Sequence, residues 1–219
     1  MRWLLSCLIF LCTADCGHTS NYKSFTVNKA DSVREAQKAE RAFIQIDAVK
    51  KTIATGDLVL RTGNDFTSES LRSLNQRNKT YSHCGIASIE NDTLFVYHAL
   101  GGEWNPDQKI RRDPFEFFAE PYSNRGIGIY RFQLPDTAIK TLMVTVKNLY
   151  HMGIMFDMQF DLQSNDRMYC AEFVYKSYLM GTNGKLQFST SHLGNFEFIG
   201  VDDIFLQPMC KEQKKILYQ

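Results

Sequence analysis

The sequence has no excess of charge of either sign, because 25 Lys and Arg residues are balanced by 24 Asp and Glu residues. Proteins that bind nucleic acid through its phosphate backbone usually carry a basic surplus. The balance argues against that class, and we expect no nucleic acid among the partners. Repeats and low-complexity tracts are also missing, and 44% of the 219 residues are hydrophobic. This composition suits one folded domain with a sizeable core.

Long hydrophobic runs are missing as well, since a membrane-spanning helix needs about 20 apolar residues. The N-terminus has Arg2, a short apolar stretch at residues 4–11 and small residues before Cys16. This pattern predicts an export signal over residues 1–16 and a protein of the bacterial cell envelope. Cys16 is placed for lipid attachment, but Asp15 before it departs from the small-residue rule. A periplasmic protein and a lipoprotein attached to the membrane through a lipidated Cys16 therefore both stay open.

Cysteine spacing argues against two further classes of site. No pair has the Cys-x-x-Cys spacing of structural zinc sites. Once the export signal is removed, Cys84, Cys170 and Cys210 remain beside Cys16. An odd set of three argues against a disulfide framework in an exported protein and leaves at least one thiol to be explained. We expect no cofactor and no structural metal.

The chain divides into an export signal (1–16), a polar linker (17–30) and a single domain (31–219). Helix-favouring charged residues from Asp31 predict a helix that Gly56 stops. Its expected contacts with the domain are Phe43, Ile44, Ile46, Val49 and Ile53. Further helices are expected at 68–76, 113–120, 136–150 and 170–181, and strands at 57–61, 83–90, 93–100 and 127–132. Residues 196–206 predict one more strand or turn, and the tail 211–219 should be solvated.

Two of the predicted strands form a hairpin around Asn91 and Asp92, which tolerate the positive φ of a tight turn. A two-residue turn puts His83 and His98 on one side of the sheet as diagonal neighbours, exposed and about 6 to 8 Å apart at the backbone. Their rings can then hydrogen-bond. The same register turns Cys84 toward the core on the opposite side. Position alone also fits a surface pair or a structural hydrogen bond.

Cys170 lies where a helix is expected to begin, just after a polar run at 163–167. A thiol at a helix N-terminus sees the positive end of the helix dipole and unpaired N–H groups, which favour the thiolate. The same N–H groups can stabilise the oxyanion that forms when a thiolate attacks a carbonyl. Free cysteines are also among the most buried residues, so a packing role for Cys170 fits equally well.

Four motifs occur in a defined order: GDLVLRTG at 56–63, YSHCGI at 81–86, VYHA at 96–99 and MYCAEFVY at 168–175. Together they resemble the YiiX/YaeF-type permuted papain-like amidases, within the NlpC-like group of papain-fold thiol hydrolases. In this family the histidine strand precedes the nucleophile helix, which is the permuted order. The resemblance spans residues 56–181. It implies an α+β, circularly permuted papain-like (NlpC-like) fold with an antiparallel sheet packed against helices.

The resemblance implies that Cys170 is the nucleophile, that His83 is its base, and that His98 orients His83. Many members have Glu where His98 stands, whereas lecithin:retinol acyltransferase-like relatives have a second His. A neutral His98 can hold the tautomer of His83 but brings no negative charge. The resemblance also covers Glu172, which we expect to be structural, and Asp157, which we expect to cap a turn or line the pocket.

These observations favour a thiol hydrolase that cleaves a small amide or peptide substrate through an acyl-enzyme, with cell-wall peptide fragments as candidates. Three alternatives stay open. They are an acyltransferase acting on lipid, a non-catalytic binding module on the same scaffold, and a metal site made of His83, His98 and Cys170. The sequence does not reveal the substrate or the oligomeric state.

Overall fold

The computed structural model describes residues 29–102 and 105–219. The predicted export signal and the predicted linker up to residue 28 lie outside the described residues, as does Cys16. Among the residues that are described, no helix has both the length and the apolar character needed to cross a membrane.

Helices and strands alternate irregularly along the described chain. In order they are α1 (Lys29–Lys50), β1 (Leu58–Gly63), α2 (Phe66–Leu74), β2 (His83–Glu90), β3 (Thr93–His98), β4 (Arg111–Pro114), α3 (Phe115–Ala119), β5 (Asn124–Phe132), α4 (Asp136–Met152), α5 (Cys170–Gly181), β6 (Ser191–Leu193), β7 (Phe196–Phe198), α6 (Val201–Phe205) and β8 (Cys210–Leu217).

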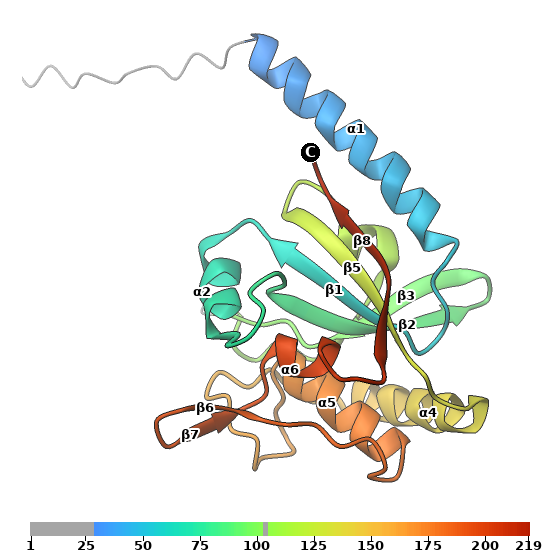
Figure 1. The fold of residues 1–219 in the computed structure, drawn as a ribbon, viewed down its shortest axis with the longest axis vertical. Coiled ribbons are helices and arrows are strands. Elements are labelled where there is room, and N and C mark those ends of the chain that lie inside the picture. Colours follow the sequence, from blue (N-terminus) through green and yellow to red (C-terminus); the bar gives the residue numbers. More distant parts are fainter. Residues whose placement is uncertain (1–28, 103–104) are drawn as a thin grey trace, which may run out of the picture.

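The centre of the fold is a six-stranded sheet in the order β4-β3-β2-β1-β5-β8, and every pairing in it is antiparallel. Helices α4, α5 and α6 lie below this sheet, and α1 runs obliquely on the other side (Figure 1). The small β6–β7 hairpin lies apart from the main sheet. This mixture of helices with an antiparallel sheet confirms the α+β class predicted from the sequence.

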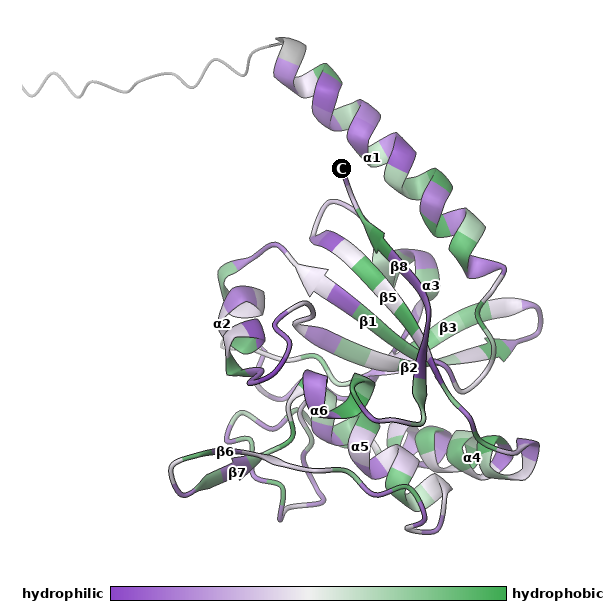
Figure 2. Ribbon diagram, in the orientation of Figure 1, coloured by the Kyte–Doolittle hydropathy of each residue, from purple (hydrophilic) through white to green (hydrophobic). Residues whose placement is uncertain are grey.

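Side chains that alternate along the strands enter two separate cores. Cys84 and Ile86 of β2 pack with residues of α4, α5 and α6, whereas Ala87 of β2 and Val96 of β3 pack with residues of α1 and α3. Figure 2 shows the central strands largely in hydrophobic colours and the outer side of α1 in hydrophilic ones. The sheet is therefore covered on both faces, which makes the direction of each β2 side chain decisive for the site.

The β2–β3 hairpin has the predicted register. Asn91 and Asp92 take positive φ values of 47° and 60°, and Ile86 pairs with Tyr97. The turn therefore contains two residues, as the alternation pattern required.

The first helix differs from the prediction in length and in contacts. It ends at Lys50, six residues before Gly56, and Thr52 bonds back to the carbonyl of Val49 through its N–H and its hydroxyl. Its buried side chains are Ala42, Ile46 and Val49, and Ile53 just after it is also buried. Phe43 is 38% exposed, yet its ring contacts that of Tyr122 edge to face, with 5.8 Å between the ring centroids. The predicted contact of Ile44 is wrong, because this side chain is 64% exposed. A long helix touches the sheet along one narrow stripe only.

The C-terminal tail also departs from the prediction. Residues 210–217 form β8, an edge strand that pairs with β5. Most side chains of β8 are exposed, which agrees with the polar composition of this segment. Ile216, and Tyr218 just after the strand, reach the core between the sheet and α1. Residues 196–206 likewise form a strand and a short helix, β7 and α6, instead of a single element.

Candidate active site

Cys170 is the first residue of α5, as the sequence predicted. The N–H of Met168 donates to the carbonyl of Met155, which fixes the chain just before the helix. The Cys170 side chain is only 6% exposed and packs in the core below the sheet. The helix thus presents its nucleophile candidate to the underside of β2.

Cys170 contacts a second thiol, that of Cys84 on β2. The Cys84 thiol contributes most to lowering the pKa of the Cys170 thiol through hydrogen bonding, and the main-chain N–H groups of Cys84 and Ala171 contribute in the same way. The charge of Arg61 contributes further to the lowered pKa, although burial opposes the shift. Burial raises the pKa of Cys84 well above its usual value. Of the two thiols, Cys170 is therefore the one that ionises.

His83 and His98 hydrogen-bond directly, with 2.8 Å between His83 Nε2 and His98 Nδ1. The sequence predicted this contact between two exposed rings. The rings are in fact buried, with His83 5% and His98 1% exposed, because Phe118 of α3 packs against both. The alternative of a solvated surface pair is therefore wrong.

Asp113 of β4 extends this pair, and the sequence analysis missed it. His98 Nε2 lies 2.9 Å from Asp113 Oδ2, and Arg111 donates to Asp113 Oδ1 at 3.0 Å. The contact arises because β4 pairs with β3, which puts Arg111 opposite His98 and Asp113 opposite Val96. Asp113 supplies the negative charge that His98 itself lacks.

Burial and nearby cations keep both imidazoles neutral. Burial lowers the pKa of His83 well below its usual value, and the charge of Arg61 adds to the effect. Burial also lowers the pKa of His98 to about 4, although Asp113 opposes the shift. Burial raises the pKa of Asp113, but hydrogen bonds from His98 and Arg111 outweigh it and hold that pKa below its usual value. A neutral base beside an ionised carboxylate results.

The thiol and the imidazoles lie on the two sides of the beginning of β2. Cys84 and Cys170 belong to the core below the sheet, whereas the imidazoles contact Phe118, which belongs to the other core. Within residues 29–102 and 105–219, no hydrogen bond joins Cys170 Sγ to either imidazole. The assignment of Cys170, His83 and His98 as one catalytic unit stays a prediction.

A small cavity of about 30 Å³ opens beside Cys170. A water molecule occupies about 30 Å³ of the liquid, so this space admits one small group and no peptide. Its lining is mostly apolar and comes from α2, the segment before β2, the start of α5 and the segment after β7: Leu71, Leu74, Asn75, Ser82, Phe160, Tyr169, Cys170, Ala171, Phe198, Ile199, Gly200 and Val201. Leu71 and Leu74 of α2 thus border this cavity.

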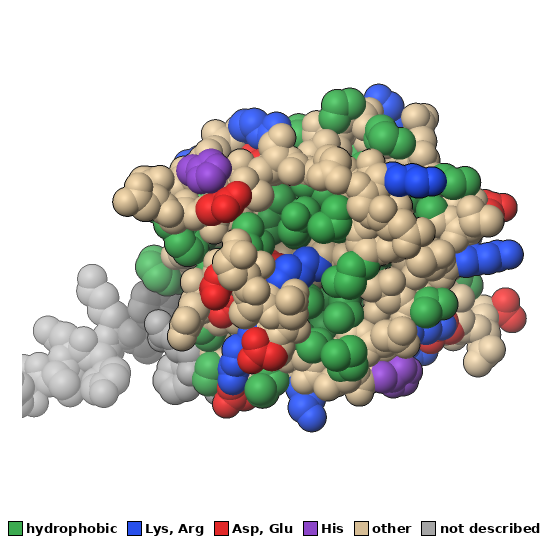
Figure 3. All heavy atoms as spheres, turned by 90° about the horizontal axis from the view of Figure 1, so that it is seen from below, with side chains coloured by type: hydrophobic (Ala, Val, Ile, Leu, Met, Phe, Trp, Pro, Cys, Tyr) green, Lys and Arg blue, Asp and Glu red, His purple; other side chains and the backbone are tan. Residues whose placement is uncertain are grey.

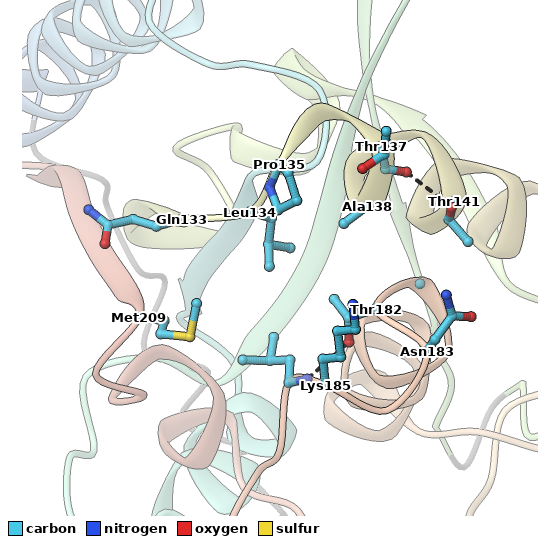
Figure 4. Close-up of a pocket in the computed structure, with 12 residues that line it drawn as sticks. Gln133, Leu134, Pro135, Thr137, Ala138, Thr141, Thr182, Asn183, Lys185 and Met209 are labelled. Carbon is cyan, nitrogen blue, oxygen red and sulfur yellow. Dashed lines mark hydrogen bonds between the residues drawn. The ribbon is translucent and has the colours of Figure 1, made fainter.

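A larger cavity of about 300 Å³ lies elsewhere, between the beginning of α4 and the end of α5. Figure 4 shows Pro135 and Thr137 on one side of it and Thr182 and Lys185 on the other. Apolar side chains also gather on the lower face of the molecule, around α4, α5 and the β6–β7 hairpin (Figure 3). Neither the size of a cavity nor the apolar surface identifies the active site, so the chemistry of the side chains has to identify it.

Other predicted positions have structural contacts. Glu172 is fully buried, accepts a hydrogen bond from the N–H of Tyr169 and pairs with Lys176 at 2.7 Å, which fits the predicted structural role. Asp157 caps a turn by accepting from the N–H groups of Gln159 and Asp161. Tyr169 Oη accepts a hydrogen bond from the N–H of Ile199, and Tyr81 is buried in the core. His151 and His192 are exposed, and Cys210 is a buried free thiol.

Metal ligands do not gather in the described part of the chain. There, no group of three or more His, Cys, Asp and Glu side chains is placed to hold an ion. Cys84, Cys170 and Cys210 are all free, in agreement with the predicted lack of a disulfide framework.

Comparison with known proteins gives the same fold and adds the family. A model of the permuted papain-like amidase enzymes, YaeF/YiiX, C92 family, matches residues 52–196. A solved structure titled crystal structure of metalloprotein yiiX from Escherichia coli O157:H7 is similar with a TM-score of 0.59 and 18% identity, covering 75% of this chain and 97% of that chain. No curated protein matches the chain. The family match spans more than half of the sequence, and the chain therefore belongs to the permuted papain-like amidases of the YaeF/YiiX type, a family of thiol hydrolases.

Proposed function

We propose that this hydrolase cleaves amide or peptide bonds with Cys170 as nucleophile, His83 as general base and His98 as the group that orients His83. The observation that carries the proposal is the place of Cys170 as the first residue of α5, where the main-chain N–H groups of Ala171 in α5 and of Cys84 in β2 lower the pKa of its thiol. A sulfur held in this way is stabilised as a thiolate. The hydrogen-bonded pair of neutral imidazoles supplies the base.

In the first half of the reaction, the Cys170 proton passes to His83 and the thiolate attacks the substrate carbonyl. N–H groups at the beginning of α5 stabilise the oxyanion of the tetrahedral intermediate. When the intermediate collapses, the C–N bond breaks and His83 returns the proton to the leaving amine. In the second half, His83 takes a proton from water, the hydroxide attacks the thioester, and the carboxylic acid leaves as the thiol is restored.

The resting arrangement needs one local change before this chemistry. Cys170 Sγ is hydrogen-bonded to Cys84, so the side chain must exchange this partner for His83. Catalytic hydrogen bonds often form only once substrate is bound.

The substrate we propose is a small amide or peptide, with cell-wall peptide fragments as candidates. The cavity of about 30 Å³ beside Cys170 admits only a compact acyl group unless its apolar walls separate. The export signal and the cell-envelope location belong to this proposal. Fractionation of cells that produce the full chain, with a Cys16→Ala variant beside it, tests both export and lipid attachment.

Labelling with iodoacetamide at neutral pH tests the nucleophile without a known substrate. Cys170 should be alkylated much faster than Cys84, because its thiol has the lower pKa and is 6% exposed against 0% for Cys84. The Cys170→Ala variant should hydrolyse no amide that the natural chain hydrolyses. Equal labelling of the two thiols in a folded sample would refute the assignment.

An acyltransferase acting on lipid is the second candidate. Two observations favour it, the second histidine at position 98 and the apolar lining of the cavity beside Cys170. Mass spectrometry of the chain after incubation with phosphatidylcholine vesicles separates the two proposals. A fatty acyl adduct on Cys170 supports the transferase, and an unmodified thiol supports the hydrolase.

The similar structure from Escherichia coli carries the word metalloprotein in its title, but the residues here do not fit the predicted three-ligand site. His83 Nε2 and His98 Nδ1 lie 2.8 Å apart and bond to each other. Two nitrogens on one tetrahedral zinc ion are about 3.3 Å apart and point at the ion instead. No step of the proposed reaction passes through a metal.

A further inference from the structure

We infer that Asp113 is a positioning residue, which sets the direction of the protons in the His83–His98 pair and leaves Nδ1 of His83 as the free basic nitrogen. The use of that nitrogen by Cys170 rests on the proposed function. The direction of the protons does not rest on the proposed function. It follows from the contacts of three side chains on β2, β3 and β4.

The carboxylate of Asp113 determines which nitrogen of His98 carries the proton. An ionised carboxylate can only accept hydrogen bonds. Asp113 Oδ2 lies 2.9 Å from His98 Nε2, so the proton between them belongs to the imidazole nitrogen. Arg111, which donates to the same carboxylate, keeps the charge on Asp113. His98 therefore carries its proton on Nε2.

The position of the proton on His98 in turn determines its position on His83. A neutral imidazole has one N–H and one acceptor nitrogen. With Nε2 protonated, His98 can only accept at Nδ1, so His83 must donate from Nε2 across the 2.8 Å contact. His83 then has no proton on Nδ1. This tautomer follows from the hydrogen-bond network.

The surroundings keep the imidazoles of His83 and His98 in the neutral form. Arg61 of β1 and Arg111 of β4 bring positive charge toward the pair, and α3 contributes the apolar ring of Phe118. Arg61 does not compete for the ring nitrogens, because it donates to the carbonyl of Phe118 and lies over that ring. The thiol of Cys170 on α5 and the carboxylate of Glu120 after α3 are further ionisable groups near Arg61.

Asp113→Asn tests the inference because it should reverse the chain of protons. Arg111 needs an acceptor, and an amide offers only its oxygen, so the new NH₂ group turns to His98. It donates to His98 Nε2, which moves the His98 proton to Nδ1 and, in turn, the His83 proton to Nδ1. The substitution preserves shape, and Asp113→Glu provides a second variant that keeps the carboxylate.

The readout is ¹⁵N NMR of the full chain with labelled histidine at neutral pH. In the natural chain, both His83 and His98 should carry the proton on Nε2, and in Asp113→Asn both should carry it on Nδ1. Asp107→Asn, at an exposed carboxylate that pairs with Arg167, should change nothing. A proton on His83 Nδ1 in the natural chain overturns the inference, and so does an Asn variant that folds with unchanged tautomers. If the Asn variant does not fold, the natural chain alone decides.

Activity separates this inference from the proposed function. With p-nitrophenyl acetate as probe, Asp113→Asn should lower kcat about 10²-fold with little change in KM, the size of a lost general base. Asp113→Glu should retain most of the rate. If the tautomers are as described and His83→Ala has full activity, the proposed function fails and the role of Asp113 in the pair stands. If His83→Ala is inactive while the tautomers do not respond, the inference fails alone.

Discussion

The two sides of the beginning of β2 hold their reactive groups in different ways. On the upper side, His83, His98 and Asp113 form a row of directional hydrogen bonds. On the lower side, Cys170 lies in an apolar core and bonds to another thiol. Directional bonds fix a ring in one orientation, whereas a thiol in a core can rotate at small cost. In the proposed reaction, the imidazole pair is therefore the fixed part and the Cys170 thiol is the part that has to move.

Removing the fixed base should have the largest effect. His83→Ala should lower the rate of p-nitrophenyl acetate hydrolysis about 10³-fold, because a general base contributes on this scale. His151→Ala, at an exposed histidine of α4, is the matched control and should hydrolyse the ester at the natural rate. Comparable rates in the two variants would contradict the assignment of the base.

On the lower side, the buried carboxyl of Glu172 should make the free energy of unfolding depend on pH. Burial raises its pKa to about 7 from 4.5, although Lys176 opposes the shift. Between these two values the unfolded chain loses the proton and the folded chain keeps it, so the free energy of unfolding falls as pH rises. The loss is up to about 3 kcal/mol.

Urea unfolding from about pH 4 to pH 8 measures this dependence. Glu172→Gln should remove most of it, since glutamine has no charge to bury. Glu40→Gln, at an exposed position of α1, should follow the natural curve. The lowered pKa values of His83 and His98 make stability rise with pH over part of this range, so the difference between the natural and Glu172→Gln curves isolates the Glu172 contribution. A difference that stays constant from pH 4 to pH 8 would show that Glu172 ionises normally in the fold.

The smallest expected effect concerns the thiol pair. The Cys84 thiol is the largest contributor to the lowered pKa of Cys170. Cys84→Ala should therefore raise the pKa of Cys170 and slow its alkylation by iodoacetamide several-fold at neutral pH. Cys210→Ala, which removes the buried thiol at the beginning of β8, serves as control. An unchanged alkylation rate in Cys84→Ala would show that the two sulfurs do not share a proton.

Local patterns of the sequence predicted the parts of the site that depend on neighbours in the chain. The alternation around Asn91 and Asp92 predicted the hairpin register, because a shift by one residue would turn every side chain of the strand to the other face of the sheet. The polar run before Cys170 marked the beginning of its helix in the same way. His83 and His98 meet as predicted because both belong to this one hairpin.

Parts that depend on distant packing were not predictable in this way. Asp113 reaches His98 only because β4 returns to pair with β3 after a long loop, and nothing in the loop sequence specifies that return. The burial of the imidazoles depends on Phe118 of α3, and the contact between Cys84 and Cys170 depends on how α5 packs on the sheet. Such contacts join segments far apart in the chain, so no local pattern encodes them.

Trapping the acyl-enzyme tests the central claim most directly. After brief mixing of the full chain with p-nitrophenyl acetate and an acid quench, peptide mass spectrometry should locate one acetyl group on Cys170, with none on Cys84 or Cys210. In His83→Ala, where acylation also lacks its base, less of this adduct should form in the same time. An acetyl group on any other side chain, or hydrolysis that persists in Cys170→Ala, would contradict the account.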